Sequence, residues 1–122
     1  MRLVSQALIL VVALAHAWFL VLEIFLWTGP IGQRTFGMTP EFSAASATLA
    51  ANQGLYNGFL VAGLVWAVIS DRRDLKIFFL ACVIVAGVFG AVTAKLTILF
   101  VQALPAAIAL IAVFLAPASR DR

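Results

Sequence analysis

Charged side chains are scarce in this chain: only 11% of its 122 residues are Asp, Glu, Lys or Arg, whereas soluble domains carry about 25%. Hydrophobic residues make up 65% of the sequence, far above the usual share of about 45–50%. This balance excludes an ordinary soluble domain and predicts an integral membrane protein. A helix needs about 20 apolar residues to cross the hydrocarbon core, and the apolar runs allow four crossings with short connections.

Cysteine, histidine and catalytic motifs are also nearly absent. Cys82 is the single cysteine, so the chain can form no internal disulfide and no cysteine-rich metal site. His16 is the single histidine and no close set of acids accompanies it, so we expect no metal. We find no glycine-rich phosphate loop and no nucleophile beside a base. The sequence therefore assigns no catalytic residue and no cofactor.

The net charge of +3 predicts a membrane orientation rather than nucleic-acid binding, because the basic residues are dispersed at the ends of apolar runs. Four crossings place both termini and the second connection on one side of the membrane. Two basic residues, Arg34 and Lys95, fall on the other side. The side of the termini has six: Arg2, Arg72, Arg73, Lys76, Arg120 and Arg122. The positive-inside rule then places both termini in the cytoplasm.

The expected fold is all-α, a single domain over residues 1–122 that forms an up-down bundle of four transmembrane helices. We place these helices at about residues 3–27, 40–70, 77–94 and 98–116. Thr39, Pro40 and Glu41 have the pattern of a helix start, with a threonine cap, a proline at the first position and an acid in the first turn. Pro105 lies inside the fourth helix, where it should loosen or kink the backbone.

Small residues predict two sites of close helix approach. In the third helix, Ala86, Gly90 and Ala94 recur four residues apart, which is typical of a small-xxx-small ridge. In the second helix, Gly54 and Gly58 also lie four residues apart. The helical period places this glycine pair on the side opposite the polar residues that surround it.

Those polar residues occupy the stretch Ala50 to Leu60, the one apolar run that repeatedly includes amides and a phenol. On a helix, Asn52, Gln53, Tyr56 and Asn57 fall within an arc of roughly 140°. Such groups commonly form hydrogen bonds between membrane helices. Four of them within six residues also fit one wall of a polar pocket, because each amide both donates and accepts.

Glu23 is the sharpest single candidate for a binding group. An acid at the membrane centre is disfavoured by about 2.5–3.5 kcal/mol on insertion scales, so it needs a partner or a water-filled cavity. It is either a ligand-binding or proton-exchanging carboxylate, or an acid that reaches water or ties the first helix to Asn57 or Arg34. His16 lies two helical turns before it and shares its face. His16 either titrates or binds a ligand, or makes a hydrogen bond between helices; Gln102, near Pro105, is a further candidate for the pocket wall.

Five segments resemble a family of small bacterial inner-membrane proteins catalogued as domain of unknown function 1304. They are Leu22 to Thr28 in the His16–Glu23 helix, Phe36 to Phe42, Ala51 to Leu60, Ala86 to Gly90 and Val101 to Pro105. The resemblance covers nearly the whole chain. It implies a multi-pass protein of the bacterial inner membrane and carries no activity to transfer.

The first functional hypothesis is a homo-oligomeric membrane protein whose pocket, in the outward half of the bilayer, binds or transports a small polar or cationic molecule or a proton. Membrane lipids would surround it, and no nucleic acid would bind. One alternative is a membrane-embedded enzyme that acts on a lipophilic substrate, with Glu23 or His16 as acid or base and Tyr56 as proton donor. Another is an accessory or assembly subunit, in which the glycine faces dock a partner and the polar residues join helices.

Overall fold

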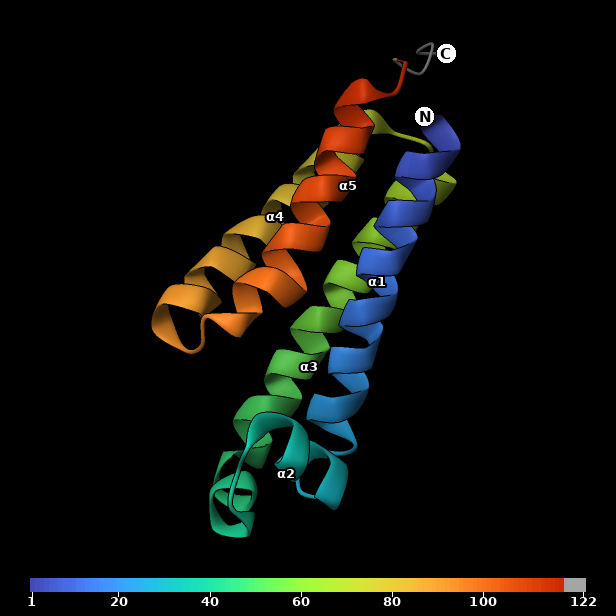
Figure 1. Cartoon of the computed structure of the whole chain (residues 1–122). Helices are drawn as coiled ribbons and strands as arrows, with labels where there is room; N and C mark the ends of the chain where they lie inside the picture. Colours follow the sequence, from blue (N-terminus) through green and yellow to red (C-terminus); the bar gives the residue numbers. More distant parts are fainter. Residues whose placement is uncertain (118–122) are drawn as a thin grey trace. The chain divides into compact units, whose positions relative to one another are not determined.

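The computed structural model describes residues 1–117, and all of its regular structure is helical (Figure 1). Arg120 and Arg122, two of the six basic residues expected on the side of the termini, lie outside these residues. The elements in chain order are α1 (Arg2–Ile24), α2 (Pro30–Phe36), α3 (Pro40–Ile69), α4 (Arg73–Thr93), the π-helical segment η1 (Leu99–Ala103) and α5 (Leu104–Leu115). The all-α prediction is thus confirmed for the described residues.

The chain divides into two compact units. The first consists of Met1–Ala13 together with the chain from Ala62 onward, and the second is Leu14–Val61. Each of the helices α1 and α3 has one end in the first unit and its other end in the second. Each unit is described by itself below, and the assignment of the chain to a single domain stays a prediction.

The start of α3 is the element that the sequence located best. The backbone N–H of Phe42 donates to the Thr39 hydroxyl at 3.2 Å, and Pro40 is the first helical residue. Glu41 lies in the first turn, where an acid interacts favourably with the positive end of the helix dipole. The threonine cap is therefore confirmed.

The connection between α1 and α3 contains a helix that the sequence analysis missed. Helix α1 ends at Ile24 rather than near Trp27, and the two-turn helix α2 follows. Gly29 precedes Pro30 at the start of α2, and Gly37 ends it in the left-handed conformation, with φ of 64°. A proline at the first position and a glycine after the last are ordinary helix punctuation, so the signal was present in the sequence.

The turn between α3 and α4 is shorter than expected, because α4 begins at Arg73 instead of near Ile77. Of the charged residues between the two helices, Asp71 and Arg72 lie in the turn, and Arg73, Asp74 and Lys76 belong to the start of α4. Asp71 adopts a left-handed backbone conformation in this turn, with φ of 51°. Aspartate is among the few non-glycine residues that tolerate this conformation.

Pro105 changes the helix before it rather than breaking it. The backbone N–H of Leu104 donates to the carbonyl of Leu99, five residues earlier, and η1 has π-helical geometry. Proline has no N–H and cannot continue the regular pattern of bonds to the carbonyl four residues earlier. The wider π turn absorbs this loss, and α5 continues to Leu115.

In the first unit, α4 packs against η1 and α5, which run back alongside it (Figure 1). Two members of the predicted ridge, Ala86 and Ala94, are exposed on the described chain. The close approach is instead at Gly87, where an added Cβ would lie 2.7 Å from the backbone nitrogen of Ala103. Gly90 faces Ile98, so one member of the predicted ridge does pack.

Two of the helices, α1 and α4, are long and apolar enough to cross a membrane. Helix α3 has 30 residues, but the amides in its middle lower its hydropathy. The η1–α5 stretch, Leu99–Leu115, is also apolar but is shorter than α1, with 23 residues, and α4, with 21. Large apolar side chains stay exposed on these elements, among them Leu3, Val85, Val92 and Ile111, as expected where lipid is the surrounding solvent.

Candidate functional site

The candidate site lies in the second unit, where Glu23 on α1 meets Asn57 on α3. The Asn57 side-chain N–H donates to the Glu23 carboxylate at 2.7 Å. Asn57 is buried, with 6% of its surface exposed, and Glu23 is partly buried. This bond ties the end of α1 to the middle of α3, which is one of the two interpretations that the sequence left open for the acid.

Glycine allows this contact to form. A Cβ added at Gly54 would lie 2.7 Å from Cγ1 of Ile24 and 3.1 Å from Cβ of Glu23. A Cβ added at Gly58 would lie 3.0 Å from Leu20. The two helices therefore come close where α3 has no side chain, and the Asn57 amide reaches the carboxylate beside that point.

No cation compensates the charge of Glu23 within residues 1–117. The ion pairs of the described chain join Arg2 and Lys76 to Asp71, and Arg72 to Asp74. Arg34, the basic partner considered from the sequence, makes none with Glu23. A carboxylate has acceptor positions for about four hydrogen bonds, and Asn57 supplies one. The site thus has an acid whose partner is a neutral amide.

His16 lies on α1 in the same unit and is almost fully buried, at 2% exposure. Its ring and the ring of Phe19 form a T-shaped pair, with centroids 5.4 Å apart and an angle of 73° between the planes. Seven residues separate it from Glu23 along the helix, which corresponds to about 10 Å. A functional role for His16 stays a prediction.

The predicted polar wall divides into one buried residue and three exposed ones. Asn57 packs against α1, whereas Asn52, Gln53 and Tyr56 are exposed on the described chain. Tyr56 makes an edge contact with the ring of Phe59 at 5.8 Å. Within the described chain Asn57 alone of the four contacts Glu23, and a pocket wall formed by all four residues stays a prediction.

Asn57 is buried because of its position on the helix, three residues after Gly54. Three residues correspond to a separation of about 60° around the helix, so Asn57 shares the glycine face that packs on α1. Asn52 and Tyr56 lie farther around the helix. The glycine pair was expected opposite the whole polar set, but Asn57 belongs to its side.

Gln102 lies on η1 in the first unit and is partly exposed. Its place in a pocket with Glu23 stays a prediction. Among the described residues, no group of three or more histidine, cysteine, aspartate or glutamate side chains is arranged to hold a metal ion.

Two polar clusters were not foreseen as contacts. Trp27, in the α1–α2 connection, donates its indole N–H to Ser46 at 3.0 Å, and Gln33 of α2 donates to Ser43 at 3.2 Å. The two bonds hold the connection and α2 to the start of α3. The sequence signal for these contacts was the spacing of the two serines, which lie three residues apart and therefore on the same side of α3. The second cluster surrounds Asp71 in the first unit, where Lys76 donates to the carboxylate at 2.5 Å and Arg2 forms an ion pair.

Comparison with known proteins agrees with the resemblance read from the sequence. A family model described as protein of unknown function (DUF1304) matches residues 10–114. A relative from Lactococcus lactis subsp. lactis (strain IL1403), named uncharacterized protein YpaA, is 32% identical over 118 residues, covering 93% of this chain and 99% of the relative. No solved structure matches the chain.

Proposed function

Because the chain belongs to the protein family of unknown function DUF1304, whose description assigns no activity, we propose a function from its own residues. The protein is a multi-pass membrane protein that binds a small cationic or polar molecule, or a proton, at Glu23. It does so as a homo-oligomer. The observation that carries the proposal is the bond from the Asn57 amide to a carboxylate that has no cationic partner in the described chain.

The membrane assignment is supported by the lengths of the helices and by the position of the charges. Four crossings would use α1, α3, α4 and the η1–α5 stretch, each at or above the roughly 17 residues that a crossing needs. The charged residues Arg2, Arg72, Arg73 and Lys76 lie at helix ends rather than in their middles. In the proposed orientation, the protein lies in a bacterial inner membrane and both of its termini face the cytoplasm.

The cation proposal follows from electrostatics. Glu23 lies near the end of an apolar helix, where an isolated negative charge is unfavourable. One amide hydrogen bond offsets part of this penalty but leaves the net charge in place. A positively charged ligand or a proton would neutralise it, and the Asn57 amide would hold the carboxylate in position.

A pair of matched acid substitutions tests this proposal. We expect tetraphenylphosphonium, a lipophilic monovalent cation, to bind the purified protein in detergent micelles, and to bind more tightly at alkaline than at acidic pH because protons compete for the carboxylate. Glu23→Gln keeps the shape of the side chain and should abolish both binding and its pH dependence in isothermal calorimetry. Glu41→Gln removes an exposed acid at the start of α3 and should leave binding unchanged.

The proton alternative has its own readout. If Glu23 takes up a proton instead of a molecular cation, infrared difference spectra across a pH step should show a carboxyl band that Glu23→Gln removes and Glu41→Gln retains. Binding of the probe by the Glu23→Gln protein at wild-type strength, with no such band lost, would contradict both forms of the proposal.

The exposed amides favour a homo-oligomer. Asn52 and Gln53 lie about 17 residues from the other end of α3, or roughly 25 Å along the helix, which is still within a hydrocarbon core of about 30 Å. Amides there need partners. Because each amide donates and accepts, the same face of a second copy supplies them in a two-fold arrangement.

This arrangement differs from the accessory-subunit alternative, in which the glycine faces dock a partner. Gly54 and Gly58 already contact α1 within the chain, so the face that remains for a partner is the polar one. The enzyme alternative uses Glu23 or His16 as acid or base and Tyr56 as proton donor, and Tyr56 is exposed on the described chain.

Cysteine crosslinking tests the oligomer. With Cys82 replaced by alanine, we expect Gln53→Cys to form a disulfide-linked dimer in membranes, whereas Leu14→Cys, exposed on α1, should not. Asn52→Leu should weaken the dimer about threefold, which corresponds to roughly 0.6 kcal/mol, the average value of such a bond between membrane helices. Monomeric wild-type protein at all concentrations, measured by light scattering, would contradict the proposal.

A further inference from the structure

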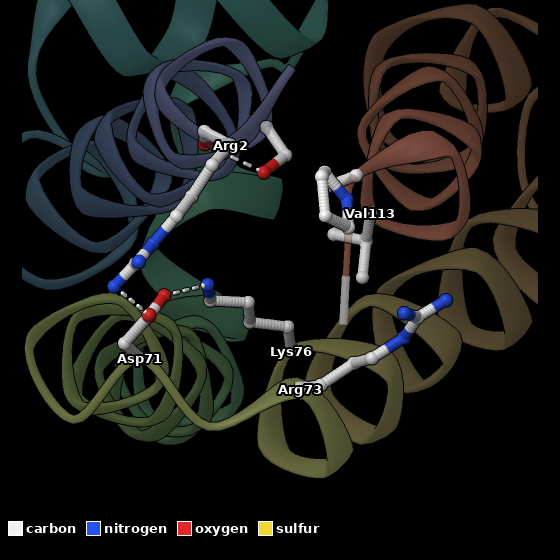
Figure 2. A pocket seen from close by; sticks show the side chains of 8 residues that line it. Arg2, Asp71, Arg73, Lys76 and Val113 are labelled. Atoms are coloured by element: carbon white, nitrogen blue, oxygen red, sulfur yellow. Dashed lines mark hydrogen bonds and ion pairs between the residues drawn. The ribbon is translucent and has the colours of Figure 1, made fainter. Parts of the chain in front are cut away.

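A small basic notch opens in the first unit, where the N-terminal end of α1, the α3–α4 turn and the C-terminal end of α5 meet (Figure 2). Its enclosed volume is about 20 Å³, which accommodates about one water molecule. The charged lining residues are Arg2, Asp71, Arg73 and Lys76, and apolar residues including Val113 and Pro117 complete it.

Asp71 organises one side of the notch. Lys76 donates to one carboxylate oxygen at 2.5 Å, Arg2 pairs with the other, and Gln6 adds a hydrogen bond at 3.1 Å. Figure 2 shows the Arg2 and Lys76 nitrogens on either side of this carboxylate. The hydrogen bond from Lys76, followed by the charges of Lys76 and Arg2, holds the pKa of the Asp71 carboxyl below its usual range. Asp71 therefore stays ionised and fixes two cations beside the notch.

Lys76 is the buried cation of this cluster. Only 5% of its surface is exposed, which is rare for a lysine and requires a paired charge. An ammonium group has three N–H donors, and the bond to Asp71 uses one. Because Lys76 lines the notch, its remaining donors are available to an anion there.

Arg73 adds a third cation that does not depend on Asp71. Its guanidinium extends toward α5 (Figure 2), donates to the Phe114 carbonyl at 3.4 Å and lies 5.8 Å from the centre of the Phe114 ring. This long bond uses one of the five N–H donors of the group. Three cations against one carboxylate leave the notch with a local charge of +2.

We propose that this notch binds the phosphate of an anionic phospholipid headgroup. The phosphate would lie over the opening, between the Arg2–Lys76 side and Arg73, since the notch itself is too small to enclose it. Basic pockets between helices at the cytoplasmic surface are suited to such headgroups. The proposal is independent of Glu23, which lies in the other unit.

The apolar surroundings favour a lipid over a free phosphate ion. Leu3 follows Arg2 and is 80% exposed, and Leu115 follows Phe114 and is 64% exposed. Acyl chains would cover these side chains while the headgroup meets the cations. A free phosphate would gain the charge contacts alone.

Neighbouring arginines provide a matched test. Arg73→Gln removes one cation from the notch without changing a bond to Asp71, whereas Arg72→Gln removes an equal charge from a side chain that pairs with Asp74 and does not line the notch. We expect wild-type protein in neutral detergent micelles to bind phosphatidylglycerol in preference to phosphatidylcholine, measured by native mass spectrometry. Arg73→Gln should weaken phosphatidylglycerol binding about fivefold, the equivalent of about 1 kcal/mol per cation near an anionic surface.

Arg72→Gln should bind like the wild type, and Arg2→Gln should reproduce the loss. Circular dichroism should show equal helicity in all three variants. Equal losses in Arg72→Gln and Arg73→Gln would overturn the proposal in favour of diffuse surface charge. So would equal binding of the two lipids, and so would displacement of phosphatidylglycerol by inorganic phosphate, because the site would then recognise the free anion.

Discussion

Gly87 should be the least replaceable small residue of α4. It is buried against η1, and a Cβ added there would lie 2.7 Å from the backbone nitrogen of Ala103 and 2.9 Å from its Cβ. Ordinary van der Waals contacts of a Cβ begin at 3.4 Å. Gly87→Ala therefore requires the backbones of α4 and η1 to separate by about 0.7 Å, the difference between 3.4 Å and 2.7 Å. A backbone cannot rotate away as a side chain can.

The expected magnitude follows from two opposing effects. Alanine is favoured over glycine in a helix by about 1 kcal/mol, whereas overpacking a close contact is unfavourable by about 1–3 kcal/mol. At Gly87 the obstacle is backbone, so the upper end applies and Gly87→Ala should destabilise the protein by about 2 kcal/mol net.

Gly90→Ala is the matched control, since it makes the same substitution one turn away. Its added Cβ would lie 3.1 Å from Cγ2 of Ile98, a side-chain atom that can shift by a few tenths of an ångström. The helix preference should then prevail, and this variant should be as stable as the wild type or more stable by up to about 1 kcal/mol. Equilibrium unfolding in mixed detergent micelles measures both. If Gly87→Ala were as stable as Gly90→Ala, the close approach at Ala103 would be refuted.

Two further predictions concern helix ends. Thr39→Ala removes the acceptor for the Phe42 N–H and should destabilise α3 by about 1 kcal/mol in thermal unfolding. Thr48→Ala, at an exposed position inside α3, should not have this effect, and equal effects of the two substitutions would contradict the cap. The lowered pKa of Asp71 means that its contribution to stability is complete above its usual value of 3.8 and is lost as the pH falls through the lower folded-state value. Asp71→Asn, which tolerates the left-handed turn, should lower the unfolding temperature at neutral pH and remove that acid-dependent loss; an unchanged acid profile would contradict the role of the carboxylate.

Local signals were sufficient for most helix boundaries. The cap at Thr39 and the disturbance at Pro105 depend on bonds between residues a few positions apart, so they can be read without knowing the partner helices. The same was true of α2, whose flanking Gly29–Pro30 and Gly37 signals were present but were interpreted as an irregular connection.

The faces of the helices could not be assigned in this way. Asn57 and Gln53 are neighbours on α3, separated by about 40°, yet Asn57 is buried and Gln53 is exposed. On α4, Gly87 and Ala86 are both small, but Gly87 is buried against Ala103 and Ala86 is exposed. In the proposed membrane setting, hydrophobicity does not distinguish lipid from a neighbouring helix, so the apolar pattern that orients soluble helices would carry no information about the packed face.

The sequence by itself determined that the chain is helical, strongly apolar and limited to one sharp candidate acid, because composition and capping act over short distances. Tertiary structure alone decided what the acid and the basic residues meet. The Glu23–Asn57 bond joins residues 34 positions apart, and the bond from Gln6 to Asp71 spans 65 positions. Such contacts depend on how helices pack against one another, and side-chain identity within a single helix does not encode that packing.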